Sequence, residues 1–111
     1  MKISSPSTIR IRGVRYPKAT EIPPKIWLNN RLLELEKSLK IKTHNLNGFG
    51  WGNDAKGALQ LALAICAEIY TEETAIRVHV QFKEAFLDKI DGECFDSILQ
   101  LVGFNEANVI G

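Results

Sequence analysis

The chain has 111 residues, of which 45% are hydrophobic and 24% charged, values typical of one globular domain. Its longest apolar stretch is about ten residues, against the roughly 20 that a membrane-spanning helix needs. The N-terminus lacks the apolar core of a signal peptide, and two cysteines cannot form a disulfide framework. We therefore expect a cytoplasmic single domain, 1–111, with an ordered core at about 8–104, no membrane contact and both cysteines as thiols.

The net charge of +1 conceals a strong asymmetry along the chain. Residues 1–43 contain ten Lys and Arg against three Glu, whereas residues 44–111 contain four against ten acidic groups. A basic half and an acidic half indicate either an anionic partner on one face or charge pairing between the two halves. The sequence leaves both interpretations open.

The first half of the chain has the pattern of short strands. Residues 9–12 alternate apolar and charged side chains, as a half-buried strand does. Residues 26–28 and 31–33 flank Asn29-Asn30, and because Asn tolerates the left-handed angles of a tight turn, they predict a hairpin. Residues 39–43 alternate again and predict a further strand, although the leucines of 32–39 also fit a helical stripe. A strand edge near 9–16 could pair with a second copy, and the oligomeric state stays open.

The second half has the pattern of helices. Asn53 or Asp54 can cap a helix over 54–70, which we expect to be buried on nearly every side because Gln60 is its one polar residue between 58 and 67. A second helix is predicted over 72–90, capped by Thr71, and a short third one over 97–102. Residues 105–111 are expected to be weakly ordered.

These elements predict an α+β fold. A small, mainly antiparallel sheet of three or four strands from the N-terminal half is expected to pack against two or three C-terminal helices. The core joining them is predicted to contain Phe49, Trp51, Leu61, Ala62, Ile65, Val78, Phe82 and Phe86.

A glycine and aromatic motif precedes the apolar helix. Its members are Gly48, Phe49, Trp51, Gly52, Gly57 and Gln60. Such a loop can bind phosphate, but Asp54 would place a carboxylate there and no Gly-Lys-Ser/Thr signature is present. We interpret the glycines as allowing the two rings to pack tightly. Gln60 is predicted to tie the loop 49–57 to the helix, with an amide facing a partner as the alternative.

The same motif carries a resemblance. Together with His44, a Gln-Leu-Ala-Leu-Ala segment at 60–64, His79 and Phe82-Lys83, it resembles an uncharacterised prokaryotic domain family common in phages and plasmids. The resemblance covers roughly residues 26–90. It implies a fold and an association with mobile elements, and it implies no reaction.

Catalytic and metal chemistry find little support in the sequence. The two histidines and two cysteines have none of the spacings of a metal site. Cys66 is predicted to be a core residue. The acidic residues around Cys94 would raise the pKa of its thiol, which disfavours a nucleophile there. We expect no catalytic residue, no metal and no cofactor.

The strongest functional signal in the sequence is a group of basic residues on the predicted strands. If the predicted strands are neighbours, they present one binding face with aromatic side chains among the cations: Arg10, Arg12, Arg15, Lys40, Lys42 and Trp27. Our first hypothesis is a non-enzymatic interaction protein with a protein partner, a phage or mobile-element adaptor or inhibitor of a host macromolecule. The alternative is a nucleic-acid-binding module, since such a face could follow a phosphate backbone while rings stack on bases.

Overall fold

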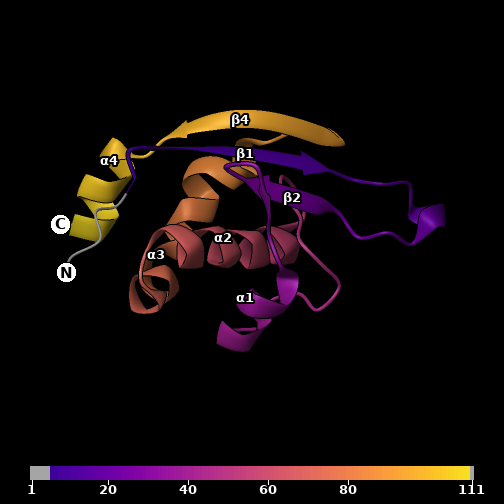
Figure 1. Ribbon diagram of the computed structural model, residues 1–111, viewed down its shortest axis with the longest axis horizontal. Coiled ribbons are helices and arrows are strands. Elements are labelled where there is room, and N and C mark those ends of the chain that lie inside the picture. Colours follow the sequence, from indigo (N-terminus) through magenta and orange to yellow (C-terminus); the bar gives the residue numbers. More distant parts are fainter. Residues whose placement is uncertain (1–5, 111) are drawn as a thin grey trace.

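The computed structural model describes residues 6–110, which form an antiparallel four-stranded sheet with helices on one side (Figure 1). The strands lie in the order β3-β2-β1-β4. Their bounds are β1 Thr8–Val14, β2 Lys25–Leu28, β3 Arg31–Leu32 and β4 Cys94–Gln100. The helices are α1 Leu35–Ile41, α2 Ala55–Ile69, α3 Glu72–Phe86 and α4 Val102–Phe104, with short turns η1 Lys18–Thr20, η2 Leu87–Lys89 and η3 Asn105–Ile110. The predicted α+β fold class is confirmed.

The hairpin and the two long helices form where the sequence predicts them. Asn29 and Asn30 have φ angles of 49° and 70° and connect β2 to β3. The Asp54 side chain caps α2, and that of Thr71 caps α3. Each accepts a hydrogen bond from a backbone N–H of the first turn, which has no partner within the helix.

The strand predicted over residues 39–43 is wrong, because residues 35–41 form α1. The helical alternative is the correct one for this segment. Helical spacing directs Ser38 toward the interior, where it is buried, and packs Leu35 and Ile41 against the core. Lys40 therefore lies on a helix, and Lys42 follows directly after it.

The helix predicted over residues 97–102 is also wrong. Residues 94–100 form β4, which pairs with β1 along its whole length, from Thr8 opposite Gln100 to Val14 opposite Cys94. Apolar residues at 95, 98, 99 and 101 fit either structure locally, and pairing with β1 selects the strand. One strand thus comes from the C-terminal end, and β1 is central rather than an edge.

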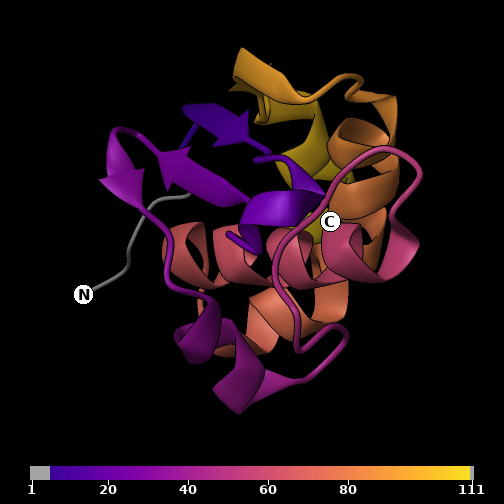
Figure 2. The same ribbon diagram turned by 90° about the vertical axis from the view of Figure 1, so that its right-hand side faces the viewer.

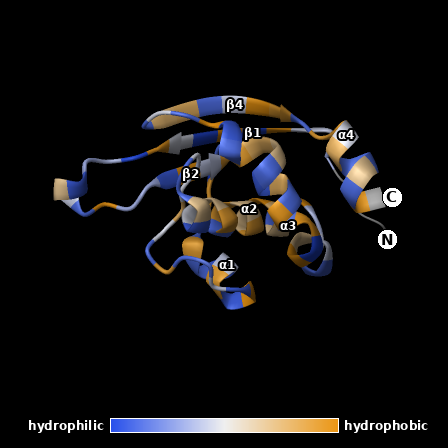
Figure 3. Cartoon of the chain, turned by 180° about the vertical axis from the view of Figure 1, so that it is seen from behind, coloured by the Kyte–Doolittle hydropathy of each residue, from blue (hydrophilic) through white to orange (hydrophobic). Residues whose placement is uncertain are grey.

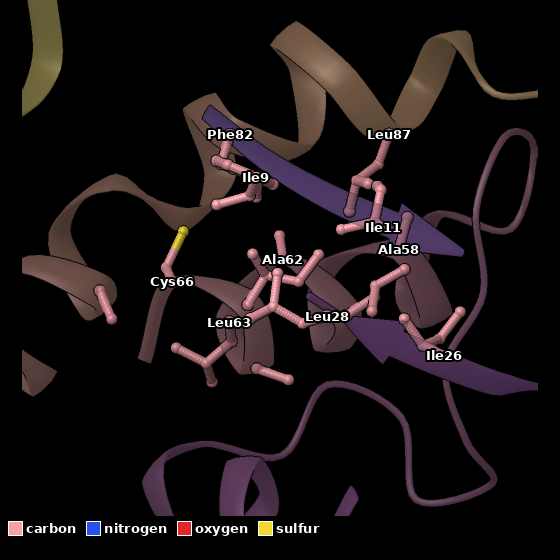
Figure 4. Close-up of a cluster of buried hydrophobic side chains, with 14 of the residues drawn as sticks. Ile9, Ile11, Ile26, Leu28, Ala58, Ala62, Leu63, Cys66, Phe82 and Leu87 are labelled. Atoms are coloured by element: carbon pink, nitrogen blue, oxygen red, sulfur yellow. The ribbon is translucent and has the colours of Figure 1, made fainter. Parts of the chain in front are cut away.

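The core lies between the sheet and α2. Side chains of Ile9 and Ile11 on β1 and of Ile26 and Leu28 on β2 meet α2, as Figure 4 shows. The middle of α2 is buried from Gly57 to Cys66 except for Leu59, which is partly buried. Of the predicted core residues all are buried except Phe86, which is partly exposed.

The C-terminal segment contacts the N-terminal end of the described chain. Residues 105–110, predicted to be weakly ordered, form the π-helical turn η3, whereas Gly111 lies outside the described residues. Asn105 is buried and donates to the Pro6 carbonyl at 2.9 Å. Among residues 6–110, none of the helices has the length and hydrophobicity required to cross a bilayer.

Candidate functional site

The aromatic rings of the glycine motif are core residues that join distant segments. Trp51 is buried, its Nε1 donates to the Gly92 carbonyl at 3.0 Å, and its ring meets the Phe95 ring at a centroid distance of 4.8 Å. The Arg15 guanidinium lies over the same ring, 4.2 Å from its centroid, and donates to the Trp51 carbonyl at 3.0 Å. Arg15 is therefore engaged in holding this loop.

The Asp54 carboxylate fills the space beside the loop glycines. Asp54 Oδ1 accepts from the Gly57 N–H at 3.1 Å. A methyl group added at Gly50 or Gly57 would lie 2.2 or 2.4 Å from Asp54 Oδ2. A carboxylate thus occupies the position that a phosphate would take at this helix start, as the sequence indicates.

Gln60 is fully buried and uses its whole amide. Its Oε1 accepts from the backbone N–H groups of His44, at 2.6 Å, and Asn45, at 3.0 Å. Its Nε2 donates to Ser38 Oγ at 2.9 Å and to the Lys42 carbonyl at 3.1 Å. The amide therefore ties residues 38–45 to α2. The loop 49–57, predicted to be its partner, is not the segment that it holds.

The two histidines, which have no meaningful spacing in sequence, meet in the structure. His44 Nε2 lies 3.0 Å from His79 Nε2. His79 Nδ1 faces the carbonyls of Ala75 and Ile76 at 3.1 and 2.9 Å, so it carries the proton. His79 Nε2 is then the acceptor and His44 Nε2 the donor. The resemblance, which includes both residues, is the one sequence signal that singles out this pair.

The histidine pair predicts a loss of stability in mild acid. Burial, followed by the proximity of His79 and Lys42, lowers the pKa of His44. The pKa of His44 in the folded protein is therefore below its unfolded value of about 6.5. The neutral His44 ring contributes its full stabilisation above that pH, and this stabilisation is lost as pH falls through the folded pKa. Urea unfolding of the wild type and of His44→Gln between about pH 7.5 and 5 should show a shallower decline for the variant. Equal declines would contradict this role.

Arg10, Arg12 and Trp27 lie on the side of the sheet that faces away from the core, because they alternate with the buried residues Ile9, Ile11, Ile26 and Leu28. Figure 2 shows the helices on the other side of the strands. Arg12 is opposite Trp27 on β2, and its guanidinium carbon lies 5.2 Å from the Trp27 ring centroid. On the neighbouring strands, Leu32 lies opposite Trp27 on β3, and Asp96 and Ile98 lie opposite Arg12 and Arg10 on β4. Leu32 and Ile98 have exposed fractions of 53% and 65%. We call this surface the outer face; its members are Arg10, Arg12, Trp27, Leu32, Asp96 and Ile98.

An ion pair neutralises part of the outer face. Arg10 donates from Nε and Nη2 to the two oxygens of Asp96, at 2.9 and 2.6 Å. The hydrogen bond to Arg10 lowers the pKa of Asp96, and Asp96 in turn raises the pKa of Arg10. The Arg12 Nε is buried and has no hydrogen-bond partner within the described residues.

The other predicted binding residues do not join this surface. Arg15 is bound to Trp51, and Lys40 and Lys42 belong to the α1 region, because residues 39–43 are not a strand. The continuous basic face expected from the sequence is thus reduced to Arg10 and Arg12 beside Trp27.

In the part of the chain that the structure describes, neither the cysteines nor the residue types that bind metals form a further candidate site. Cys66 is buried in α2 as predicted, and burial raises the pKa of its thiol, whereas Cys94 is exposed on β4. Within residues 6–110, no three His, Cys, Asp or Glu side chains are grouped as a metal site requires.

Comparison with known proteins identifies one family. A family model described as a family of unknown function, DUF6166, matches residues 12–101. The match spans the glycine motif, both histidines and every member of the outer face except Arg10. No curated protein and no solved structure is significantly similar to the chain. Because the family model covers most of the sequence, the chain belongs to the DUF6166 family, whose function is unknown.

Proposed function

We propose that this protein is a non-enzymatic interaction module that binds a protein partner through the outer face. The observation that carries the proposal is a sheet face that no helix of residues 6–110 covers, on which Trp27 and Arg12 pack against each other. Exposed Leu32 lies opposite Trp27, and exposed Ile98 lies opposite Arg10. Figure 1 shows the helices α1, α2 and α3 on the opposite side of the strands.

The composition of this face suits a protein partner. Trp and Arg are enriched among residues that dominate binding energy, and the contacts around such residues serve to exclude water. The Trp27 ring and the Arg12 guanidinium are already packed against each other on paired strands. Little side-chain freedom therefore remains to be lost on binding, which favours affinity.

Charge favours a protein over a nucleic acid. Binding to a phosphate backbone depends on several free cations. On the outer face, Arg10 is paired with Asp96 at 2.6 Å, and Lys40 and Lys42 lie elsewhere. Nucleic-acid binding through Arg10 and Arg12 is the alternative function, and it is the weaker one because of this pairing.

As a finer proposal, the partner is a macromolecule of a host cell, and the protein acts on it in the cytoplasm as a phage or mobile-element adaptor or inhibitor. The resemblance of the glycine motif, His44 and His79 to a family common in phages and plasmids supports this assignment. A small surface-binding domain is sufficient for either role.

The test compares the wild type with an Arg12→Ala/Trp27→Ala double variant as baits in cells that encode the protein. Partners enriched by the wild type should be lost from the double variant, since its central aromatic and cationic contacts are removed. Lys40→Ala/Lys42→Ala is the matched control, because these exposed lysines lie off the outer face. Retention of every partner by the double variant would contradict the proposal.

Fluorescence anisotropy separates the alternative. We expect no salt-sensitive binding of labelled single- or double-stranded DNA or RNA. Salt-sensitive binding that disappears in Arg10→Ala/Arg12→Ala would assign the outer face to nucleic acid and displace the protein-partner proposal.

A further inference from the structure

Arg12 lies between Trp27 and Asp96 on the neighbouring strands, and it has no carboxylate partner within residues 6–110. The ion pairs of the described residues have Arg10, Lys37 and Lys83 as their cations. The Arg12 Nε is buried without a hydrogen-bond partner there, whereas the side chain as a whole is partly exposed. A cation that is partly withdrawn from water without a counter-charge is electrostatically incomplete, and an incoming carboxylate compensates for the lost hydration.

Trp27 supports the Arg12 guanidinium from the adjacent strand. The guanidinium carbon lies over the indole ring, 5.2 Å from its centroid. A guanidinium that packs on an aromatic ring keeps its edge donors available for planar, bidentate binding of a carboxylate. Because the donors are already positioned, little side-chain freedom is lost when a carboxylate binds.

The ion pair beside Arg12 leaves its guanidinium open. Asp96 lies opposite Arg12 on β4, so its carboxylate is within reach as an internal partner. Both oxygens of Asp96 instead accept hydrogen bonds from Arg10, at 2.9 and 2.6 Å. The hydrogen bond to Arg10 and, as a smaller effect, the charge of Arg12 lower the pKa of Asp96. Arg10 therefore keeps the Asp96 carboxylate away from Arg12.

The charges around Arg12 favour an anionic partner. On β2, Lys25 alternates with buried residues and points to the same side of the sheet as Trp27. On the four strands, three cations thus face outward, Arg10, Arg12 and Lys25, against the single carboxylate of Asp96. In Figure 3, β1 and β4 lie at the top of the molecule with no helix of the described chain above them. Such a face attracts an acidic segment and repels a basic one.

Apolar side chains near Arg12 indicate what accompanies the anion. Leu32 lies opposite Trp27 and Ile98 lies opposite Arg10, and both are exposed. From the spacing of strands and residues in a sheet, each lies about 8–10 Å from Arg12, on opposite sides of it. A protein segment can place hydrocarbon on both sides of a carboxylate. A nucleic-acid backbone would place further phosphates there and depends on several free cations.

We propose that the outer face binds a partner segment in which an Asp or Glu side chain is flanked by apolar residues. The carboxylate binds the Arg12 guanidinium, and the apolar side chains pack against Leu32 and Ile98. This inference rests on the proposed function and specifies the chemistry of its partner. Arg12 is then the residue that determines specificity, and Arg10 is a positioning residue that acts through Asp96.

The probe is the peptide Ser-Gln-Leu-Thr-Glu-Thr-Leu-Gln-Ser with both ends blocked, so that the Glu side chain is its one charge. Titration into ¹⁵N-labelled protein, followed by nuclear magnetic resonance, measures binding through the Trp27 indole and Arg12 Nε signals. We expect saturable binding with a Kd below about 1 mM. Two matched peptides, one with Gln in place of Glu and one with Ser in place of both Leu, should bind at least about tenfold more weakly.

Arg12→Lys tests the guanidinium, because it keeps the charge and loses the planar pair of donors. Peptide binding should weaken at least about tenfold in this variant. Lys89→Ala is the matched control and should bind as the wild type does. Lys89 lines a groove of about 510 Å³ on the helix side of β4, so the control also removes one exposed cation beside apolar side chains.

Arg10→Ala tests the positioning role. It releases the Asp96 carboxylate, which can then turn to Arg12 and compete with the peptide, so binding should weaken. Lys25→Ala is the matched control for charge, since it removes one outward cation and leaves the ion pair intact. Arg10→Ala should weaken binding at least about threefold more than Lys25→Ala, and Arg10→Ala/Asp96→Ala should restore it. Equal effects of Arg10→Ala and Lys25→Ala would overturn the positioning role.

The outcomes separate this inference from the proposed function. Absence of peptide binding, equal binding of the Gln peptide, or equal binding by Arg12→Lys would each overturn the carboxylate site. If cellular partners were still lost from the Arg12→Ala/Trp27→Ala bait, the proposed function would stand without it. Equal weakening by Lys89→Ala would place the peptide in the groove and overturn the site on the outer face. Self-association in sedimentation that Arg12→Lys abolishes would assign the acidic segment to a second copy and overturn a separate partner.

Discussion

Gln60→Leu is expected to lower the free energy of unfolding by about 4 kcal/mol. The substitution removes four hydrogen bonds and leaves the two backbone N–H groups of 44 and 45, Ser38 Oγ and the Lys42 carbonyl without this partner. A buried polar group that loses its partner costs about 1–3 kcal/mol, and the partly exposed groups among these recover some of it from water. Urea unfolding monitored by far-ultraviolet circular dichroism measures the change.

Gln60→Glu is the matched control for shape. An ionised Glu can accept from both N–H groups, but it cannot donate to Ser38 Oγ or to the Lys42 carbonyl. We expect a loss at neutral pH that becomes smaller relative to the wild type toward about pH 4, where the carboxyl is protonated and can donate again. A Gln60→Leu protein as stable as the wild type would contradict the role of this amide.

The elements that the sequence predicts correctly are those with local signals. Asp54 and Thr71 are side chains that cap helices, and an Asn pair favours the left-handed turn between β2 and β3. Each signal lies within a few residues of the structure that it produces. The apolar stretch after Gly57 is likewise long enough to indicate a buried helix by itself.

The incorrect predictions concern segments whose structure depends on distant partners. The leucines around residue 35 and the apolar residues around 98 fit a helix or a strand equally well by periodicity. Pairing with β1, whose residues lie 80 to 92 positions earlier in the sequence, makes 94–100 a strand. Packing against α2 makes 35–41 a helix.

The candidate site shows the same division. Alternation along residues 9–12 places Arg10 and Arg12 on one face, which the structure has. The predicted contribution of Lys40 and Lys42 depended on the incorrect strand. The contact between His44 and His79, and the groove beside β4, arise from the packing of α3, so no spacing in the sequence indicates them.

Gly57→Ala is expected to lower the free energy of unfolding by about 3 kcal/mol, although alanine is the better helix former by about 1 kcal/mol. A Cβ at this position would lie 2.4 Å from Asp54 Oδ2 and 2.8 Å from the Gly50 backbone nitrogen. Relief would require moving the carboxylate that caps α2 or the backbone that carries Phe49 and Trp51, and overpacking of this kind costs about 1–3 kcal/mol in addition to a lost cap.

Gly103→Ala is the control, since a Cβ there has no neighbour within 4 Å among the described residues. Helix propensity then acts alone, and the protein should be unchanged or slightly stabilised. Opposite signs for the two variants in urea unfolding would mean that Gly57 is required by close packing of the loop against Asp54. Equal, small effects would remove that requirement and with it the interpretation of the glycine motif as a packing device.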